Sequence, residues 1–207
     1  MEVIINFKTY KYGNDVLKLA KSIEKVDKKI IIGVQPTDIS TISKKTKLKV
    51  YSQHVDSVFP GRGNGFITPE AAKSVGAIGT FLNHSEHPLD FKILKKTIQR
   101  CKNIKLKTAV FASSLREMKK IAKLNPDLLI YEPPKLVAGD ISVSKSNPEK
   151  IKKISQKIKT PFLVGAGIKT KKDVKKVIEF GASGIAISSG ICKSKKPKIK
   201  LQKLIKK

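Results

Sequence analysis

The 207-residue sequence lacks tryptophan and contains only two cysteines, Cys101 and Cys192. Two cysteines are too few to cross-link a fold of this size, and they lack the spacing of zinc ligands. We therefore expect reduced thiols in a cytoplasmic protein, without disulfides or zinc. Long hydrophobic runs are also missing, because the longest span only four or five residues and a membrane-spanning helix needs roughly 18. We expect neither a signal peptide nor a transmembrane segment.

Acidic side chains are scarce: 16 Asp and Glu stand against 44 Lys and Arg, which gives a net charge of +28. Such a charge suggests nucleic-acid binding, because cationic surfaces release the counterions of a polyanion. However, arginine occurs only at Arg62, Arg100 and Arg116, and no aromatic residues alternate with the basic runs. The lysines fall between apolar positions, as in residues 150–154 and 171–178, which is typical of solvated helix faces. We expect nucleic acid not to be the primary partner.

The sequence contains eight short apolar runs that alternate with amphipathic segments. The runs cover residues 3–7, 30–35, 50–55, 78–84, 107–112, 128–132, 162–167 and 184–190. Each is continuous, as in strands that are buried on both faces. Eight strand-helix units of about 26 residues each predict a compact (β/α)8 barrel that forms a single domain over residues 1–207.

A doubly wound open sheet is the alternative, because the same alternation of strands and helices builds it. No G-x-G-x-x-G follows the first run, and polar residues recur at the ends of the runs, which favours the barrel. Helical periodicity covers residues 16–26, 93–101, 151–158 and 197–207. Helix starts are indicated at Thr68-Pro69-Glu70, at Asn147-Pro148-Glu149, and by capping-box spacing between Thr170 and Asp173.

Glu132 ends an apolar run and is followed by Pro133-Pro134 and the lid-like residues 135–140. A carboxylate held at a strand end beside a mobile loop is well placed to act as a general base. Proton abstraction next to a carbonyl creates an enediolate, which would eliminate a neighbouring phosphate unless a loop closed over it. The segment therefore predicts a base with its lid.

Other strand ends carry residues that suit the same chemistry. Asn6 and Lys8 flank Phe7, so the two-residue strand period predicts that both face one space. His84 lies between a strand and a helix whose N-terminus would disfavour imidazolium and keep the ring neutral. The last two strands end in small residues, whose N–H groups can approach a phosphate, at Gly165-Ala166-Gly167 and Ser188-Ser189-Gly190. Each motif alone also fits a solvated lysine, a turn-capping histidine or a crowded strand end.

Six motifs in chain order resemble the triosephosphate isomerase family, especially its short archaeal branch. They are Asn6-Phe7-Lys8, Gln53-His54, Asn83-His84-Ser85-Glu86, Tyr131-Glu132-Pro133-Pro134, Gly165-Ala166-Gly167 and Ser188-Ser189-Gly190. The resemblance extends from the first strand to the last helix. It implies an isomerase of glycolysis and gluconeogenesis that interconverts glyceraldehyde 3-phosphate and dihydroxyacetone phosphate, needs no cofactor or metal, and assembles as a dimer or tetramer.

The resemblance also implies roles for individual residues. Glu132 would remove the proton, His84 would polarise the carbonyl and shuttle protons, and Lys8 would stabilise negative charge while Asn6 bonds the substrate. Supporting positions would be Gln53, Ser85 and Glu86. The implied substrate-binding residues are Asn6, Phe7, Lys8, Val137, Ala138, Gly167, Ser188 and Ser189.

The chain also departs from the family pattern. Its lid reads Ala138-Gly139-Asp140 where the family has glycines around a threonine, and Asp140 brings negative charge towards a phosphate. Residues 62–65 replace a threonine that reaches a neighbouring subunit, and His87 stands where many relatives carry arginine or asparagine. Two alternatives stay open: a sugar-phosphate isomerase of amino acid biosynthesis, which would need two phosphate sites or paired aspartates, and a non-catalytic barrel that binds anions or RNA.

Overall fold

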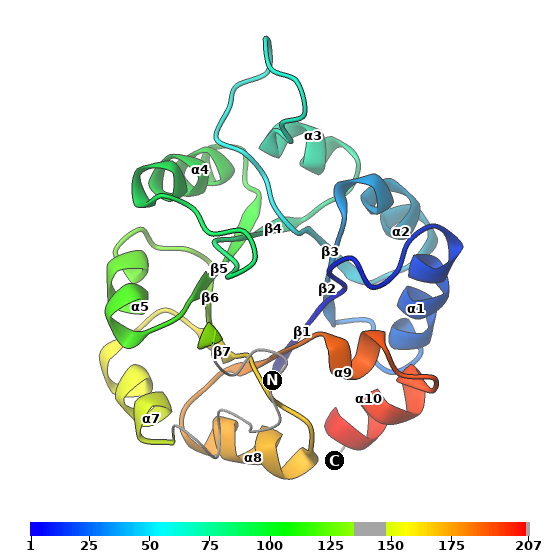
Figure 1. Ribbon diagram of the computed structural model, residues 1–207, viewed down its shortest axis with the longest axis vertical. Coiled ribbons are helices and arrows are strands. Elements are labelled where there is room, and N and C mark those ends of the chain that lie inside the picture. Colours follow the sequence, from blue (N-terminus) through cyan, green and yellow to red (C-terminus); the bar gives the residue numbers. More distant parts are fainter. Residues whose placement is uncertain (135–147, 206–207) are drawn as a thin grey trace.

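A computed structural model describes residues 1–134 and 148–205 of the chain. Its eight strands form a closed barrel in sequence order, ringed by helices (Figure 1). The strands are β1 (Glu2–Asn6), β2 (Ile31–Val34), β3 (Lys49–Ser52), β4 (Gly79–Leu82), β5 (Lys107–Ala112), β6 (Leu128–Tyr131), β7 (Phe162–Val164) and β8 (Gly184–Ile187). All eight predicted strands are confirmed.

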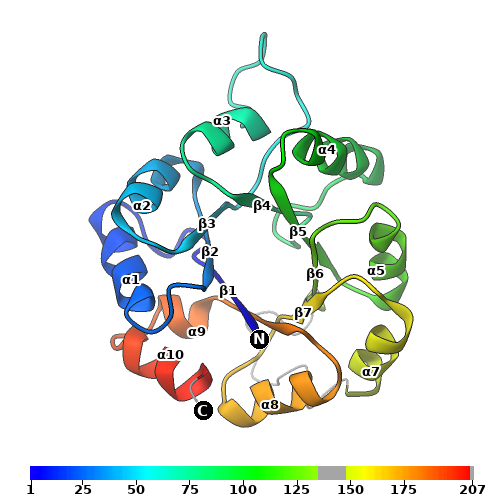
Figure 2. The same cartoon turned by 180° about the vertical axis from the view of Figure 1, so that it is seen from behind.

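Helices lie outside the strands and connect them in sequence, except for the last two helices, which follow β8 (Figure 2). They are α1 (Asn14–Glu24), the short η1 (Pro36–Asp38) with α2 (Ile39–Lys45), α3 (Pro69–Ser74), α4 (Phe91–Asn103), α5 (Leu115–Ala122), α7 (Pro148–Lys157), α8 (Lys171–Glu179), α9 (Ser189–Cys192) and α10 (Pro197–Ile205). The hydroxyl of Thr68 accepts from the Ala71 N–H at 3.1 Å, and Thr170 and Asp173 form the predicted capping box. Asn147 lies outside the described residues.

Pairing between the first and last strands closes the barrel and excludes the open sheet. β1 pairs in parallel with both β2 and β8, so that Ile4 lies opposite Ile31 on one side and Ala186 on the other. Closure brings the carboxyl ends of all eight strands to one rim. Each predicted site residue that follows a strand within the described segments is thereby directed to the same end of the molecule.

The alternating directions of strand side chains divide the core into two layers. Inside the barrel lie apolar residues that include the rings of Tyr51, Phe81 and Phe111, while the larger outer layer packs between strands and helices. Gly33 leaves room in the interior, because a Cβ there would collide with the Phe81 ring. The barrel is therefore filled with side chains below the rim, and a ligand can enter only at its end.

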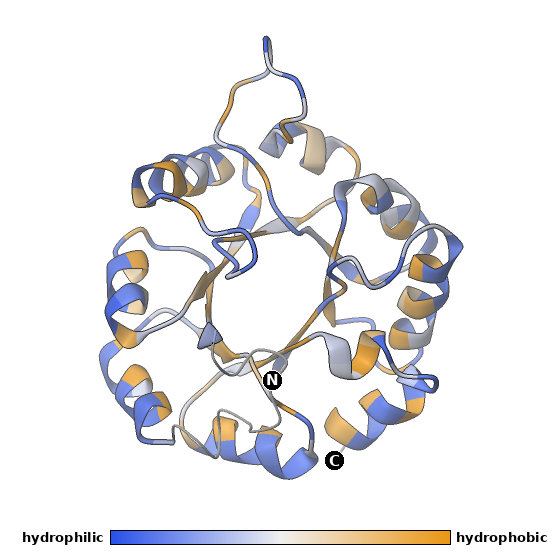
Figure 3. Cartoon of the chain, viewed as in Figure 1, coloured by the Kyte–Doolittle hydropathy of each residue, from blue (hydrophilic) through white to orange (hydrophobic). Residues whose placement is uncertain are grey.

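The outer surface carries the lysines, and apolar residues of the helices face the strands (Figure 3). This distribution agrees with the predicted solvated helix faces. Both cysteines are free and buried, and burial raises the pKa of each thiol to about 12. None of the helices in the described segments is long and apolar enough to span a bilayer. The cytoplasmic location stays a prediction.

Candidate active site

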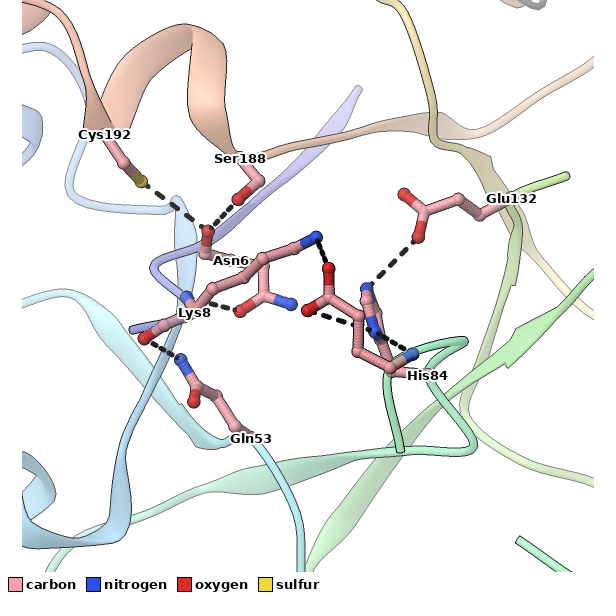
Figure 4. Close-up of polar contacts among 8 residues, drawn as sticks. Asn6, Lys8, Gln53, His84, Glu132, Ser188 and Cys192 are labelled. Carbon is pink, nitrogen blue, oxygen red and sulfur yellow. Dashed lines mark hydrogen bonds and ion pairs between the residues drawn. The ribbon is translucent and has the colours of Figure 1, made fainter. Parts of the chain in front are cut away.

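A cavity of about 170 Å³ opens at the carboxyl ends of the strands. It brings together predicted residues from both halves of the chain, several of which are shown in Figure 4. Its lining consists of Asn6, Lys8, Tyr10, His84, Phe111, Glu132, Ala166, Gly167, Ile168, Lys169, Ala186, Ile187, Ser188, Ser189 and Gly190. Its size suits a small substrate.

Asn6 and Lys8 both line the cavity, as predicted, although the strand ends at Asn6. The backbone of Lys8 is left-handed, with φ of 46°, a conformation that costs a non-glycine residue about 1 kcal/mol or more. Two hydrogen bonds hold it: the Lys8 N–H donates to Asn6 Oδ1 at 3.0 Å, and Gln53 Nε2 donates to the Lys8 carbonyl at 2.9 Å. Because the amide oxygen of Asn6 is engaged, its NH2 group is the one that can donate to a substrate.

The Lys8 ammonium is held by a carboxylate from the loop after β4. Its Nζ lies 2.6 Å from Glu86 Oε1, and the Lys8 side chain is 13% exposed, compared with 58% for Glu86. The cation is therefore largely removed from water, while its counter-charge stays solvated. A cation in this setting acts strongly on negative charge that develops nearby.

The ring of His84 is fixed in one tautomer. The backbone N–H of Glu86 donates to Nδ1 at 3.1 Å, so Nδ1 carries no proton and the neutral ring bears its proton on Nε2. The edge-to-face contact with Phe111, at 4.7 Å between ring centres, sets the plane of the ring. The sequence predicted a neutral ring from the N-terminus of a helix that follows the turn; that helix is α4, which begins at Phe91, and its effect on the ring stays a prediction. The group that the structure shows in contact with the ring nitrogen is the backbone N–H of Glu86 in the turn.

Glu132 lies opposite that protonated nitrogen. Its Oε2 is 3.2 Å from His84 Nε2, without the alignment of a hydrogen bond, and it is buried with no hydrogen-bond partner among the described residues. A buried carboxylate oxygen left unpaired is unusual and is typical of reactive groups. The side chain is only 13% exposed. This atom is therefore suited to take a proton from a bound ligand.

Gly165 gives the carboxylate of Glu132 its space. A Cβ at this position would lie 2.6 Å from Glu132 Oε1, closer than two unbonded atoms can approach without a shift. The Gly165 N–H donates to the carbonyl of Tyr131 at 2.9 Å, which keeps the two strand ends together. The small residue after β7 is thus required by the acid after β6.

The other side of the cavity consists of small residues and backbone. Ala166 and Gly167 have positive φ values of 72° and 68°, which turn the chain sharply after β7. The Ser188 hydroxyl donates to the Asn6 carbonyl at 2.7 Å and joins β8 to β1. Ser189 and Gly190 open α9, where the first N–H groups of a helix have no partner within it. This side offers donors to an anion.

Comparison with known proteins shows which family this chain belongs to. A family model described as triosephosphate isomerase matches residues 1–111. The chain is 38% identical to the triosephosphate isomerase of Methanocaldococcus jannaschii, covering 100% of this chain and 99% of the relative. It is 37% identical to that of Sulfolobus acidocaldarius, covering 99% and 93%. The chain belongs to the triosephosphate isomerase family.

A second family model, described as histidine biosynthesis protein, matches residues 98–205. The two matches divide the barrel near its middle. The relatives of the triosephosphate isomerase family match across the whole chain, and one from Methanobacterium bryantii is 36% identical over 99% of it. The full-length matches therefore take precedence over the match to the second half.

Some residues that the resemblance to the triosephosphate isomerase family assigned to substrate binding are not found in the cavity lining. Phe7 is a correction, because its side chain is 1% exposed and belongs to the outer core, not to the cavity lining. Val137 and Ala138, like Asp140, lie outside the described residues. Ser85 lines a neighbouring cavity of about 260 Å³ that also reaches Glu132.

Several residues that line the cavity were not predicted individually from the sequence. Phe111, Ala186 and Ile187 appeared only as members of apolar strands, and Tyr10, Ile168 and Lys169 only as loop residues. Strand parity could have indicated Phe111, since alternate residues of β5 face inward. In the described part of the chain, no group of three His, Cys, Asp or Glu side chains could hold a metal ion.

Proposed function

We propose that this chain interconverts glyceraldehyde 3-phosphate and dihydroxyacetone phosphate by proton transfer through an enediolate. The observation that carries the proposal is the facing pair of Glu132, whose buried Oε2 has no hydrogen-bond partner among the described residues, and His84, whose Nε2 lies 3.2 Å away while its Nδ1 accepts from the Glu86 N–H. One group can accept a proton from carbon while the other donates to oxygen. Aldose-ketose isomerisation requires that combination.

In the proposed reaction Glu132 removes the proton from the carbon next to the carbonyl and returns it to the neighbouring carbon. Its carboxylate is held by the backbone bond from the Glu132 N–H to the Ala112 carbonyl, at 3.0 Å, and by contact with Gly165. A fixed base close to the reacting carbon avoids the entropy cost of an encounter. The same carboxylate serves both proton transfers.

His84 would act as a neutral electrophile. Its Nε2–H points towards the space that the substrate oxygens would occupy, and its Nδ1 is already engaged by the Glu86 N–H. Donation from a neutral ring leaves an imidazolate that can take the proton back from the other oxygen. Proton shuttling between the two oxygens therefore needs no second acid.

Lys8 and Asn6 would stabilise the negative charge of the enediolate and orient the substrate. Lys8 is largely buried beside Glu86, and the free NH2 of Asn6 faces the same cavity. Donors fixed before reaction stabilise developing charge without reorganising. Gly167, Ser188 and Ser189 would receive the phosphate, with Val137 and Ala138 of the predicted lid as further contacts.

A coupled assay tests this proposal. Purified protein should convert glyceraldehyde 3-phosphate to dihydroxyacetone phosphate, detected as NADH oxidation by an added glycerol-phosphate dehydrogenase, and inorganic phosphate should inhibit competitively. The unphosphorylated glyceraldehyde serves as the control, because a reaction that depends on the phosphate side of the cavity should be far slower with it. Absence of turnover under conditions where a known triosephosphate isomerase is active would refute the proposal.

A sugar-phosphate isomerase of amino acid biosynthesis is the second candidate, favoured by the match of residues 98–205. That chemistry would need two phosphate sites or paired aspartates. In the cavity the described lining contains one acidic residue, Glu132, and one group of small residues suited to a phosphate. Turnover of a doubly phosphorylated sugar at a rate above that of the triose phosphates would favour this candidate.

We also propose that the chain forms a homo-oligomer through the segment between β3 and α3, which projects outward in Figure 1. Phe59 is 75% and Phe66 is 55% exposed on this segment. Exposed aromatic side chains on a projecting loop suit insertion into another subunit. Light scattering at moderate salt should give a mass above that of one chain, and Phe66→Ser should lower it.

A further inference from the structure

The chain has three histidines, and all three lie in one cluster at the rim of the barrel. His54 follows β3, while His84 and His87 belong to the turn after β4. The rings of His54 and His87 stack with their centres 4.1 Å apart and an angle of 18° between their planes. His84 is already placed in the proposed mechanism, but the other two have no role in it.

The stack touches the turn that fixes His84. Residues 84 and 87 form an antiparallel bridge, in which the His87 N–H donates to the His84 carbonyl at 2.8 Å. Within the same turn the Glu86 N–H meets His84 Nδ1, and the Glu86 carboxylate meets Lys8. The intervening residues of the turn are exposed. The position of His87 therefore bears on two contacts of the proposed catalytic groups.

On its other side the stack rests on a fixed residue. His54 is 12% exposed at its side chain, its Nε2 lies 3.2 Å from Asp56 Oδ1, and its carbonyl accepts from the Ser52 hydroxyl at 2.6 Å. Asp56 is itself held, because its Oδ2 accepts from the Ile67 N–H at 2.7 Å. His54 thus provides a rigid surface at the base of the segment between β3 and α3.

We propose that His54 and His87 are positioning residues that hold the β4–α4 turn, so that the Glu86 N–H stays on His84 Nδ1 and the Glu86 carboxylate stays on Lys8. The proposal rests on the proposed function, in which His84 donates from Nε2. Without the stack the exposed turn can shift, Nδ1 loses its donor, and His84 can take the other tautomer. A ring with its proton on Nδ1 presents no proton to the substrate.

The cluster also makes the arrangement sensitive to acid. Burial lowers the pKa of His54, and the neighbouring His87 lowers it further, while the bond to Asp56 acts in the opposite direction. Among the described residues, the charged group that contacts the stack is Asp56 from the β3–α3 segment, while Glu86 of the turn lies beside His84, with its Oε2 3.9 Å from Nδ1. A lowered pKa means that the fold favours the neutral ring, so the stabilisation is complete above the ordinary histidine pKa of about 6.5 and falls as the pH drops below it.

The test combines kinetics with ¹⁵N NMR of the imidazole rings, which is simple in a chain with three histidines. In His87→Ala, kcat should fall about 10-fold with KM changed less than twofold, since small misplacements of a catalytic group are costly. The His84 signals should change from a single Nε2–H tautomer to a mixture. The double variant His54→Phe, His87→Phe keeps a stacked pair without ionisation, so it should retain both kcat and the single tautomer near neutral pH.

The acid side of the pH profile separates positioning from a general loss of stability. As the pH falls from 6.5 through the lowered pKa of His54, the native protein should lose kcat, whereas the double phenylalanine variant should lose less. Lys95→Ala, exposed on α4 and outside the cluster, is the control and should match the native protein. Native tautomer and kcat in His87→Ala would overturn the proposal, as would equal damage in the phenylalanine pair. If His87→Ala failed to fold, His87→Asn, which also removes the stacked ring, would provide the same comparison.

Failure of the proposed function would be recognised separately. A native protein without isomerase activity would refute that function, while the NMR tautomer of His84 would still report whether the stack holds the turn.

Discussion

The two halves of the barrel contribute to the cavity in different ways. The half from β1 to β4 supplies polar side chains that are bonded to each other, such as Lys8 to Glu86 and Gln53 to the Lys8 carbonyl. The half from β5 to β8 supplies mainly backbone and small residues, such as Ala166 and Gly167, with Glu132 as its only acidic contribution to the described lining.

Under the proposed function, the first half would supply the electrophile and the cation, and the second half would supply room and most of the anion contacts. The family comparisons divide nearby, with an overlap that includes most of β5. Residues 1–111 match the triosephosphate isomerase model, whereas residues 98–205 match a model of another sequence family. Phosphate sites at this end of the barrel serve many enzymes, so the proposed function rests on how Lys8 and His84 are placed with Glu132.

Glu132 is the exception to the division, and removing its charge should have the largest effect. Glu132→Gln keeps the shape but cannot accept a proton, so kcat should fall at least about 10³-fold. The melting temperature should stay close to that of the native protein. Glu179→Gln, an exposed position on α8, is the matched control. Retention of kcat in Glu132→Gln would exclude Glu132 as the base.

Removal of the Lys8 ammonium should have the second-largest effect and should act on the chemical step. Lys8→Met keeps the length of the side chain but leaves the enediolate without its nearest positive charge, so kcat/KM should fall about 10²-fold or more. Steady-state kinetics measure this directly, and Lys18→Met on α1, whose partner Asp15 is also exposed, is the control. If Lys8→Met changed only KM, and by less than tenfold, Lys8 would not act in the chemical step, and the proposed difference between the two halves would be wrong.

Gly165→Ala tests whether the reaction depends on the position of the Glu132 carboxylate. The new Cβ would displace a carboxylate oxygen that lies 2.6 Å away, so kcat should fall about 10- to 100-fold. Circular dichroism should show a folded barrel. If Gly165→Ala retained native kcat, the carboxylate would tolerate displacement and its position would not limit the reaction.

Changes at the phosphate side should be smaller and should appear in KM. Ser188→Ala removes the bond from the hydroxyl to the Asn6 carbonyl, 2.7 Å in length, which should raise KM about 3- to 10-fold, equivalent to a hydrogen bond of about 1 kcal/mol. The value of kcat should change less than threefold. A loss in kcat alone would mean that Ser188 supports Asn6 in the reaction and not substrate binding.

Much of this architecture could be predicted from the sequence. The eight strands appeared as continuous apolar runs, since strands of a closed barrel are buried on both faces. The run 107–112 matches β5, but the other seven ends were placed too late, as in residues 162–167 for β7, which ends at Val164. Glycine and alanine at the rim look like buried residues in the sequence, but here they leave the strand and enclose the cavity.

Contacts between loops could not be predicted. Asn6, Lys8, His84 and Glu132 were identified from motifs at strand ends, but the bond from the Glu86 N–H to His84 depends on how one turn closes. The stack of His54 on His87 depends on two loops that are 33 residues apart in the chain. No local propensity or periodicity encodes such a contact. For the same reason the sequence suggested a helix N-terminus as the group near His84, and the contact from the Glu86 N–H could not be predicted.

Solvent exchange at carbon tests the central claim most directly. Dihydroxyacetone phosphate is incubated in deuterium oxide with native protein or with Glu132→Gln, and deuterium at its C1 is followed by NMR. Native protein should exchange one C1 hydrogen stereospecifically and yield glyceraldehyde 3-phosphate labelled at C2, while the variant should show only the uncatalysed rate. Equal exchange in both proteins, or turnover by native protein without any deuterium in substrate or product, would contradict proton transfer by Glu132.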